Sequence, residues 1–277
     1  MSSDLSGKRE FDIRDHIAGP AGFLGAAANV IMQLGWPEVG YGVVESKVDS
    51  GNVMLRPWKR LRTTITYLVV ALFGTDKDRR TYREAVNRSH VPVKSGPDSP
   101  VKYNAFDPAL QLWVAACLYI GFRDMRVHFL GPMDDETAED LYQYCSRLGT
   151  SLQVTDDMWP RDLEAFEKYW QEGLARVRYD DAVRDHLLAL VDLRMVPRVL
   201  RLGNAPVNRF FTVGMLPPEF REAMRLEWTE SDQRRFDRWV AFFRFFSRRM
   251  PRFARNLPIY LQLAEFRFRV RRGWKLT

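Results

Sequence analysis

Apolar residues along this chain recur at intervals of three and four, which is the periodicity of helices, and no stretch keeps the alternation of a strand. The pattern predicts helices at about 21–35, 57–73, 76–90, 109–122, 134–148, 160–173, 180–196, 217–226, 230–248 and 257–270. Neither a linker nor an internal repeat divides them. We therefore predict an all-α fold with one helical domain over residues 16–277.

The segments between the predicted helices are rich in glycine, proline and charged residues. The glycine-containing segment 40–46 and the charged segment 123–131 are interpreted as connections, and Pro197 and Pro206 as breaks between helices. Residues 1–15 are polar and charged, so we expect a mobile arm or a short lead-in helix there. The helices are expected to follow one another with little chain between them.

Residues 17–37 contain no charged side chain, and that length alone permits a membrane span. The stretch also holds several glycines, a proline and the polar residues Asn29 and Gln33, which argue against a span. We expect instead a buried helix, whose glycine and alanine face lets another helix or a flat ligand approach closely.

Two predicted helices place polar side chains on otherwise apolar faces. In the first, Arg60, Thr64 and Tyr67 occupy positions i, i+4 and i+7, so one cation and two hydroxyl groups share a stripe. In the second, His90 lies on the apolar face at the point where the helix ends, and a polar loop follows. This pattern makes these four residues candidates for a polar site against an apolar wall.

The same region carries a series of motifs with fixed spacing. R-x-x-x-T-x-x-Y precedes an apolar run that ends in FG, and V-N-x-x-H-x-x-V and Y-x-A-x-D-P-x-L-x-x-W-V follow. In these motifs, a core of about residues 20–150 resembles the catalytic domain of MpaB-type oxygenases and latex-clearing rubber oxygenases. The resemblance implies a largely helical protein, with a globin-like core around a pocket for haem b.

The resemblance also implies roles for individual residues. His90 matches the histidine that binds the haem iron as the axial ligand, while Arg60, Thr64 and Tyr67 would lie beside the cofactor. Glu45 stands at about the distance before the Arg–Thr pair at which the latex-clearing branch carries a candidate base. By this resemblance Arg60, Thr64 and Glu45 are the candidate catalytic residues, and His90 is the metal ligand.

Simpler explanations exist for each of the candidate catalytic residues. Arg60 could be a surface cation, because Arg62 and Thr63 offer a competing register on the same helix. Thr64 could bond only to its own backbone, as threonines in helices often do. Glu45 could cap a helix or face the solvent.

The reaction that the resemblance implies uses dioxygen. A haem held by His90 would react with O2 on its opposite face, where Arg60 and Thr64 could donate hydrogen bonds. The implied substrate is apolar and unsaturated, such as an isoprenoid or lipid chain, and is cleaved at a double bond. The chain departs from the family pattern at Ala115, where a histidine often occurs, and at Gly96, which comes one residue late and alters the loop over the pocket.

The distribution of charged residues along the sequence is also compatible with other functions. The hydrophobic content of 46% and the charged content of 28% describe a folded chain, and the formal net charge is +7. Thirteen basic residues and two acidic ones occur between Arg234 and Lys275. This basic region is either a solvated face or a contact for phosphate groups. The alternatives are therefore a haem protein that senses or stores without turnover, and a helical module that binds a membrane or, as a weaker alternative, nucleic acid.

Several classes of protein are excluded by what the sequence lacks. Cys117 and Cys145 form neither a disulfide framework nor a zinc motif. The motifs of P-loop, dinucleotide-binding, zinc-protease and serine-hydrolase sites are absent. The first residues carry no apolar leader, so we expect a cytoplasmic protein whose basic region could touch a membrane.

Overall fold

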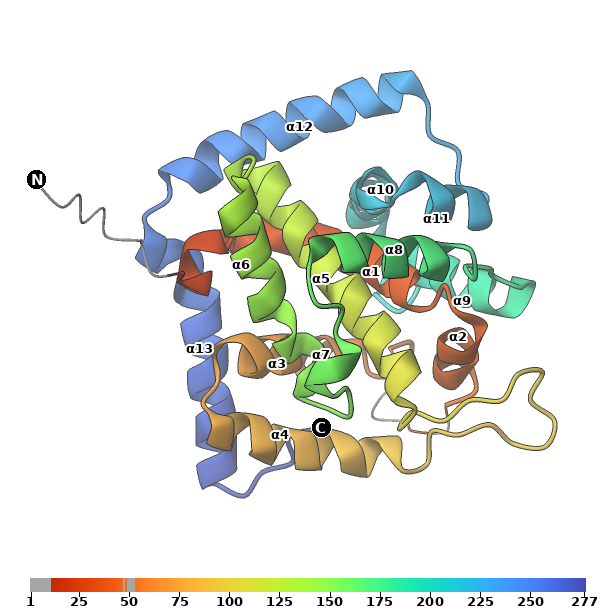
Figure 1. Ribbon diagram of the computed structural model, residues 1–277. Helices are drawn as coiled ribbons and strands as arrows, with labels where there is room; N and C mark the ends of the chain where they lie inside the picture. The colour runs from red at the N-terminus through yellow and green to blue at the C-terminus, as the bar shows by residue number, and fades with distance from the viewer. Residues whose placement is uncertain (1–10, 47, 49–52) are drawn as a thin grey trace, which may run out of the picture.

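The computed structural model describes residues 11–46, 48 and 53–277, and in those ranges the chain is built from helices, with one isolated bridge between Lys94 and Asn104 (Figure 1). The prediction of an all-α, multi-helix fold is therefore confirmed. Residues 1–10, which make up most of the predicted mobile arm, lie outside the described residues. Residues after them form a short 3-10 helix in which Ile13 and His16 are buried.

Apart from a longer loop at residues 91–107, most of the helices follow one another with short connections. In chain order they are η1 (Ile13–His16), η2 (Gly19–Gly25), α1 (Ala26–Gln33), α2 (Pro37–Val44), α3 (Pro57–Phe73), α4 (Asp76–His90), α5 (Pro108–Leu130), α6 (Asp135–Cys145), α7 (Arg147–Thr150), η4 (Asp156–Met158), α8 (Leu163–Leu174), α9 (Asp181–Val191), α10 (Arg198–Met215), α11 (Pro218–Ala223), α12 (Glu230–Arg249) and α13 (Arg252–Arg271).

Capping residues determine where the helices of the site begin. The Thr75 side chain accepts a hydrogen bond from the backbone N–H of Asp78, whose carboxylate accepts from the N–H of Thr75 in return, so a capping box starts α4. Asp107 caps α5 ahead of Pro108, as predicted. Because its start is fixed in this way, the 15-residue helix α4 places His90 at its C-terminal end.

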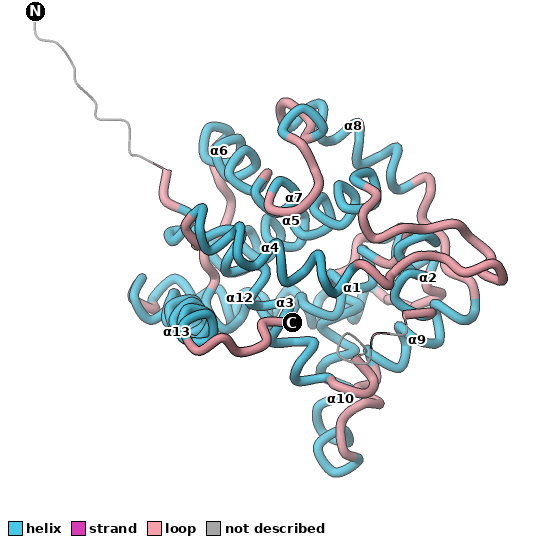
Figure 2. Tube along the Cα trace, turned by 90° about the horizontal axis from the view of Figure 1, so that it is seen from below, coloured by secondary structure: helices cyan, strands magenta, loops and turns pink. Residues whose placement is uncertain are grey.

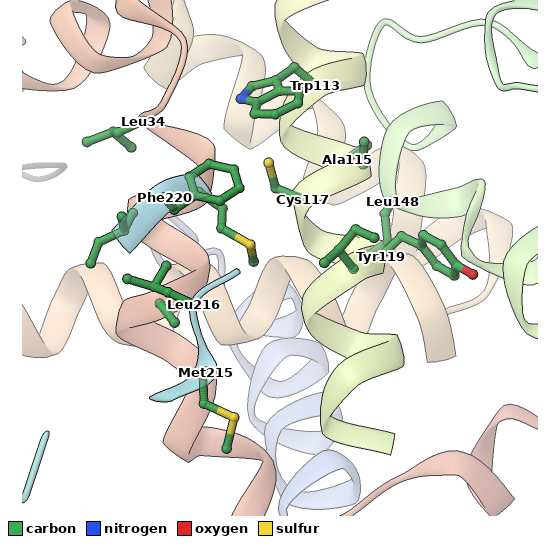
Figure 3. Close-up of a cluster of buried hydrophobic side chains, with 14 of the residues drawn as sticks. Leu34, Trp113, Ala115, Cys117, Tyr119, Leu148, Met215, Leu216 and Phe220 are labelled. Atoms are coloured by element: carbon green, nitrogen blue, oxygen red, sulfur yellow. The ribbon is translucent and has the colours of Figure 1, made fainter. Parts of the chain in front are cut away.

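Helix α5 runs through the middle of the molecule (Figure 1). Trp113, Cys117 and Tyr119 of this helix are almost completely buried. Figure 3 shows Cys117 beside Phe220 of α11, and Tyr119 on the side of Leu148 of α7. The core of the protein is therefore assembled around α5, against which α1, α7, α12 and η2 also pack.

Helix α5 continues through the segment 123–131, which we predicted to be a connection. That prediction was wrong because the charged side chains of the segment find partners without breaking the helix. Arg123 pairs with Asp124 at 2.9 Å, and Arg126 donates to the carbonyl of Gly131. The helix ends only at Gly131, whose φ of +103° favours glycine.

Two other predicted interruptions also lie within helices. The segment 40–46 mostly belongs to α2, which Pro37 starts at a favourable first position. Helix α10 passes through Pro206, and α13 begins at Arg252, ahead of the predicted start, and passes through Pro258. A proline removes one hydrogen bond from a helix, and the remaining turns of these long helices offset that loss.

The charge-free stretch 17–37 is divided between η2, α1 and the start of α2, and Ile31 and Met32 of α1 are buried, as expected of a core segment. Within the described ranges, the structure has no helix with the length and apolar character needed to cross a membrane. The loop between α4 and α5 projects beside α2 (Figure 2). The candidate site lies where α3 and α4 face α1, α2 and α5.

Candidate functional site

Four of the predicted site residues line one cavity. Arg60, Thr64 and Tyr67 of α3 and His90 of α4 border a space of about 260 Å³, which we name the His90 cavity. Apolar residues of α1, α2, α5 and the loop after α4 form much of the remaining wall, and they include Val30, Leu34, Val39, Val43, Val93, Leu110 and Val114. The structure thus brings together the polar stripe of α3 and the end of α4.

The imidazole of His90 has an unusual environment for a polar ring. Its Nδ1 atom is buried and has no hydrogen-bond partner within the described part of the chain. The ring of Phe106 meets it edge to face, with 6.3 Å between the ring centroids. Burial, together with the charge of Arg60, lowers the pKa of His90 to about 4. At neutral pH the imidazole is therefore uncharged and has a lone pair free for a ligand.

Arg60 and Thr64 interact across one turn of α3. The guanidinium of Arg60 donates from Nη1 to Oγ1 of Thr64 at 2.8 Å, and the Thr64 hydroxyl donates to the Arg60 carbonyl at 3.0 Å. Arg60 is an exposed residue that borders the His90 cavity, and desolvation by the surrounding protein lowers its pKa. The pair therefore presents a cation and a fixed hydroxyl to the same space as His90.

The competing register of α3 faces elsewhere. Arg62 lies 3.6 Å from the carboxylate of Glu265 on α13, and the hydroxyl of Thr63 bonds to the carbonyl of Arg60. Neither Arg62 nor Thr63 borders the His90 cavity. The stripe of Arg60 and Thr64 is thus the one that faces the cavity.

Tyr67 holds part of the cavity wall in place. Its hydroxyl donates to the carbonyl of Leu148 in α7, and burial raises its pKa. Tyr67 therefore stays a neutral hydrogen-bond donor that ties α3 to α7, and its ring borders the cavity.

Glu45 reaches the cavity only through another residue. It is the C-cap of α2, and its Oε2 accepts a hydrogen bond of 2.9 Å from the hydroxyl of Tyr103. Burial and this carboxylate raise the pKa of Tyr103 to about 12. Tyr103 lines the His90 cavity, whereas Glu45 lies behind it.

Glu38 is a cavity residue that our reading of the sequence missed. It lies seven residues before Glu45, near the start of α2, and borders the His90 cavity. Its Oε1 accepts from Arg176 at 3.1 Å, while Oε2 is buried and has no partner among the described residues. The sequence signal for Glu38 was its i, i+7 spacing from Glu45, which places two residues on one face of a helix. This spacing is informative only once residues 37–44 are known to be helical.

His186 of α9 is a second missed residue. It also borders the His90 cavity, and burial lowers its pKa. Its i, i+3 spacing from Val183, a buried residue of the same helix, is the signal that could have placed it on the inward face. Two histidines on two different helices therefore face one space.

The donor set of this cavity fits a haem. Among the described residues, no three His, Cys, Asp or Glu side chains gather as a protein-bound metal ion would require. A haem brings its own ring nitrogens and needs an axial ligand, which the unpartnered imidazole of His90 could supply. At about 260 Å³ the cavity lies below the usual range for ligand pockets, so side chains of its wall would have to move to admit a porphyrin.

A second cavity, of about 240 Å³, adjoins the first, and we name it the apolar cavity. Both cavities are bordered by Val30, Gln33, Thr64 and Leu148, so these residues form the wall between them. Apolar residues of α3, α5 and α13 line most of the second cavity, among them Leu61, Ile65, Leu68, Val69, Leu118, Phe122, Met125, Pro258 and Ile259. It opens to solvent beside Phe23 and Leu61, whose exposed fractions are 47% and 43%.

Comparison with known proteins gives three findings. The sequence model of a family described as "ER-bound oxygenase mpaB/B'/Rubber oxygenase, catalytic domain" matches residues 13–245. An uncharacterized protein of Mycobacterium tuberculosis and one of Mycobacterium bovis are each 50% identical to this chain over 251 residues, which cover 91% of it and 98% of each relative. The search of solved structures gave no significant match.

Proposed function

This chain belongs to the family of the mpaB/B' and rubber oxygenase catalytic domain, and from that membership we propose that it is a haem b-dependent oxygenase acting with O2 on an apolar, unsaturated substrate. The observation that carries the haem assignment is the buried, unpartnered Nδ1 of an uncharged His90 in a cavity shared with Arg60 and Thr64. When bound, the haem would supply the redox chemistry with O2.

Each polar residue of the His90 cavity has a separate role in this proposal. His90 would hold the iron, and its pKa of about 4 keeps the ring in the uncharged form that a metal ligand requires. Arg60 places a fixed positive charge at the cavity, and Thr64 is held in position by the two hydrogen bonds that join it to Arg60. The apolar wall excludes water and so strengthens these electrostatic interactions.

A carboxylate is needed where a proton is taken from the substrate. We assign this role to Glu38, because its Oε2 is buried beside the cavity and has no partner among the described residues. Glu45 is the candidate that the resemblance suggested. In this proposal it acts indirectly, by accepting a hydrogen bond from the hydroxyl of Tyr103. Tyr67 and Tyr103 then serve as neutral donors, since both have raised pKa values.

The surface of α12 favours an additional contact with a membrane. One face of this helix carries Trp239, Phe242 and Phe246, with exposed fractions of 47%, 50% and 52%. Arg235, Arg238 and Arg249 share that face, which we name the α12 face. Aromatic side chains flanked by arginines are typical of helices that lie in the headgroup region of anionic lipids. We include peripheral membrane contact in the proposal on this ground.

The assay that separates an oxygenase from a haem sensor is consumption of O2. Protein loaded with haem b is mixed with a reductant and an unsaturated isoprenoid or lipid, and O2 uptake and carbonyl products are measured. The oxygenase proposal predicts uptake that depends on the double bond and is absent with the saturated analogue. Bound haem with no substrate-dependent uptake would favour the sensor.

A further inference from the structure

The apolar cavity has one charged end. His16, Arg126 and Arg255 border it there, on η1, α5 and α13. The Nε of Arg126 donates to Nδ1 of His16 at 3.2 Å. Burial, with the charge of Arg126, lowers the pKa of His16 to about 4, so at neutral pH this ring is an uncharged acceptor that orients the arginine.

The charged end lies far from the wall that separates the two cavities. The ring of Phe11 stacks on His16 with 4.9 Å between centroids and lies 5.5 Å from the ring of Tyr144, whose hydroxyl donates to the carbonyl of Leu72. This series of contacts leads from His16 toward Leu72, near the C-terminal end of α3, whereas Thr64 of the wall is eight residues earlier. Eight residues of helix span roughly 12 Å.

The two arginines keep an excess of positive charge at this end. The nearby carboxylates are Asp12 and Asp15, and both pair with Arg252 at the surface. The Nε of Arg255 is buried and has no hydrogen-bond partner in the described part of the chain. Burial lowers the pKa of Arg126 and of Arg255, and the charge of Arg255 lowers that of Arg126 further. A buried donor without a partner is costly, so an anion that accepts from it would be stabilising.

We propose that the apolar cavity binds an amphipathic ligand, whose anionic head is a carboxylate or phosphate paired with Arg126 and Arg255, and whose apolar chain extends toward Thr64. A chain that reaches Thr64 ends at the wall of the His90 cavity. This inference deepens the proposed function, because it names the substrate as an unsaturated acid or phosphate ester whose double bond lies well away from its head. That the chain is oxidised rests on the proposed function. The binding itself needs no haem.

Binding to the full-length protein tests the proposal, with oleate, oleyl phosphate and oleyl alcohol as probes. These ligands share one chain and differ only in the head group. Wild-type protein should bind oleate or oleyl phosphate about tenfold more tightly than the alcohol, since a charged hydrogen bond is lost with the alcohol. Whichever anion binds more tightly identifies the head. Equal affinity for all three ligands would overturn the assignment of the charged end.

Substitutions locate the head group. Arg126→Gln and Arg255→Gln should each weaken binding of the preferred anion about tenfold and leave binding of the alcohol nearly unchanged. Arg255→Lys should retain most of the preference for the anion over the alcohol, because it keeps the positive charge. This variant shows whether a loss in Arg255→Gln comes from the missing charge rather than from misfolding. Arg83→Gln, at an exposed position of α4 and outside both cavities, is the matched control. Wild-type affinity in both glutamine variants would contradict the proposal.

Two further binding measurements distinguish this proposal from simple phosphate binding and from the haem proposal. Inorganic phosphate alone should not displace the anionic ligand, and displacement by it would mean that the chain contributes nothing. The His90→Ala variant should bind the anion as wild type does, since His90 lies outside the apolar cavity. Failure of haem binding and failure of anion binding are thus observed independently.

Discussion

Arg60 influences the charge of His90 within one cavity. Arg60 lowers the pKa of His90, and the uncharged imidazole in turn leaves Arg60 as the cation that faces the cavity beside Thr64. Helical spacing predicted that Arg60, Thr64 and Tyr67 share a face, and the family resemblance implied that His90 lies beside them. Neither predicted Glu38 or any place for His186, since their roles depend on which helices pack around α3.

Titration of His90 makes the stability of the protein depend on pH. In the unfolded chain a histidine has a pKa near 6.5, whereas that of folded His90 is about 4. Between these values the unfolded chain binds a proton that the folded protein rejects, so the free energy of unfolding falls as the pH is lowered from 6.5 to 4. Urea unfolding of haem-free protein at pH 7 and pH 5 should show a smaller fall for His90→Ala than for wild type. Equal falls would mean that the folded protein does not disfavour protonation of His90.

Glu38 and Glu45 make different predictions for turnover. Glu38→Gln removes the proton acceptor that borders the cavity, so kcat should drop by about 100-fold or more, with the haem spectrum unchanged. Glu45→Gln removes only a partner of Tyr103 and should cost much less. Steady-state O2 uptake measures both variants. A large loss for Glu45→Gln with near wild-type activity for Glu38→Gln would reverse the assignment.

Among the elements, α5 and α8 show how tightly the core is built around aromatic rings. The rings of Trp36 and Trp113 stack at 4.7 Å, and those of Trp113 and Trp170 at 5.2 Å. The indole N–H of Trp36 donates to the carbonyl of Gly173 at 3.0 Å, which joins α8 to the segment before α2. Periodicity predicted most of the long helices but missed α2 and α10, because 40–46 was interpreted as a connection and Pro206 as a break. The end of α5 and the start of α13 were also mispredicted, since both depend on tertiary partners.

Gly173 tests this packing directly. A Cβ atom at Gly173 would lie 2.5 Å from Cζ3 of Trp113, which is completely buried and cannot move aside. Gly173→Ala should therefore lower the free energy of unfolding by about 1–3 kcal/mol. Gly203→Ala, at an exposed position of α10 with open space around it, should instead raise it by about 0.5–1 kcal/mol. Thermal unfolding compares the two, and an unchanged midpoint for Gly173→Ala would show that the stack can yield.

At the scale of the whole molecule, the two adjoining cavities and the α12 face have different proposed roles. The His90 cavity carries the polar chemistry, the apolar cavity accommodates a chain, and the α12 face offers aromatic and basic groups to a lipid surface. The excess of basic residues in the C-terminal region was evident in the sequence. Their alignment with exposed rings was not, because it depends on which face of α12 packs against α5.

Vesicle binding tests the α12 face. Wild type should co-sediment with vesicles that contain phosphatidylserine more than with purely neutral vesicles, and salt should weaken the binding. The double variant Arg238→Ala, Arg249→Ala should bind about tenfold or more weakly, since each arginine near an anionic surface contributes about 1 kcal/mol. Arg80→Ala, Arg83→Ala on α4, at the opposite side of the molecule (Figure 1), is the matched control. Equal loss in both pairs would point to net charge rather than to the α12 face.

The absorption spectrum of the His90→Ala variant tests the central claim most directly. After addition of haem b, wild type should show a Soret band of a protein-bound haem, and His90→Ala should lose most of it because the axial ligand is gone. His128→Ala, in which the altered ring lies outside the His90 cavity, should keep the wild-type band. A His90→Ala spectrum identical to that of wild type, or no bound haem in either protein, would contradict the assignment of His90 as the iron ligand.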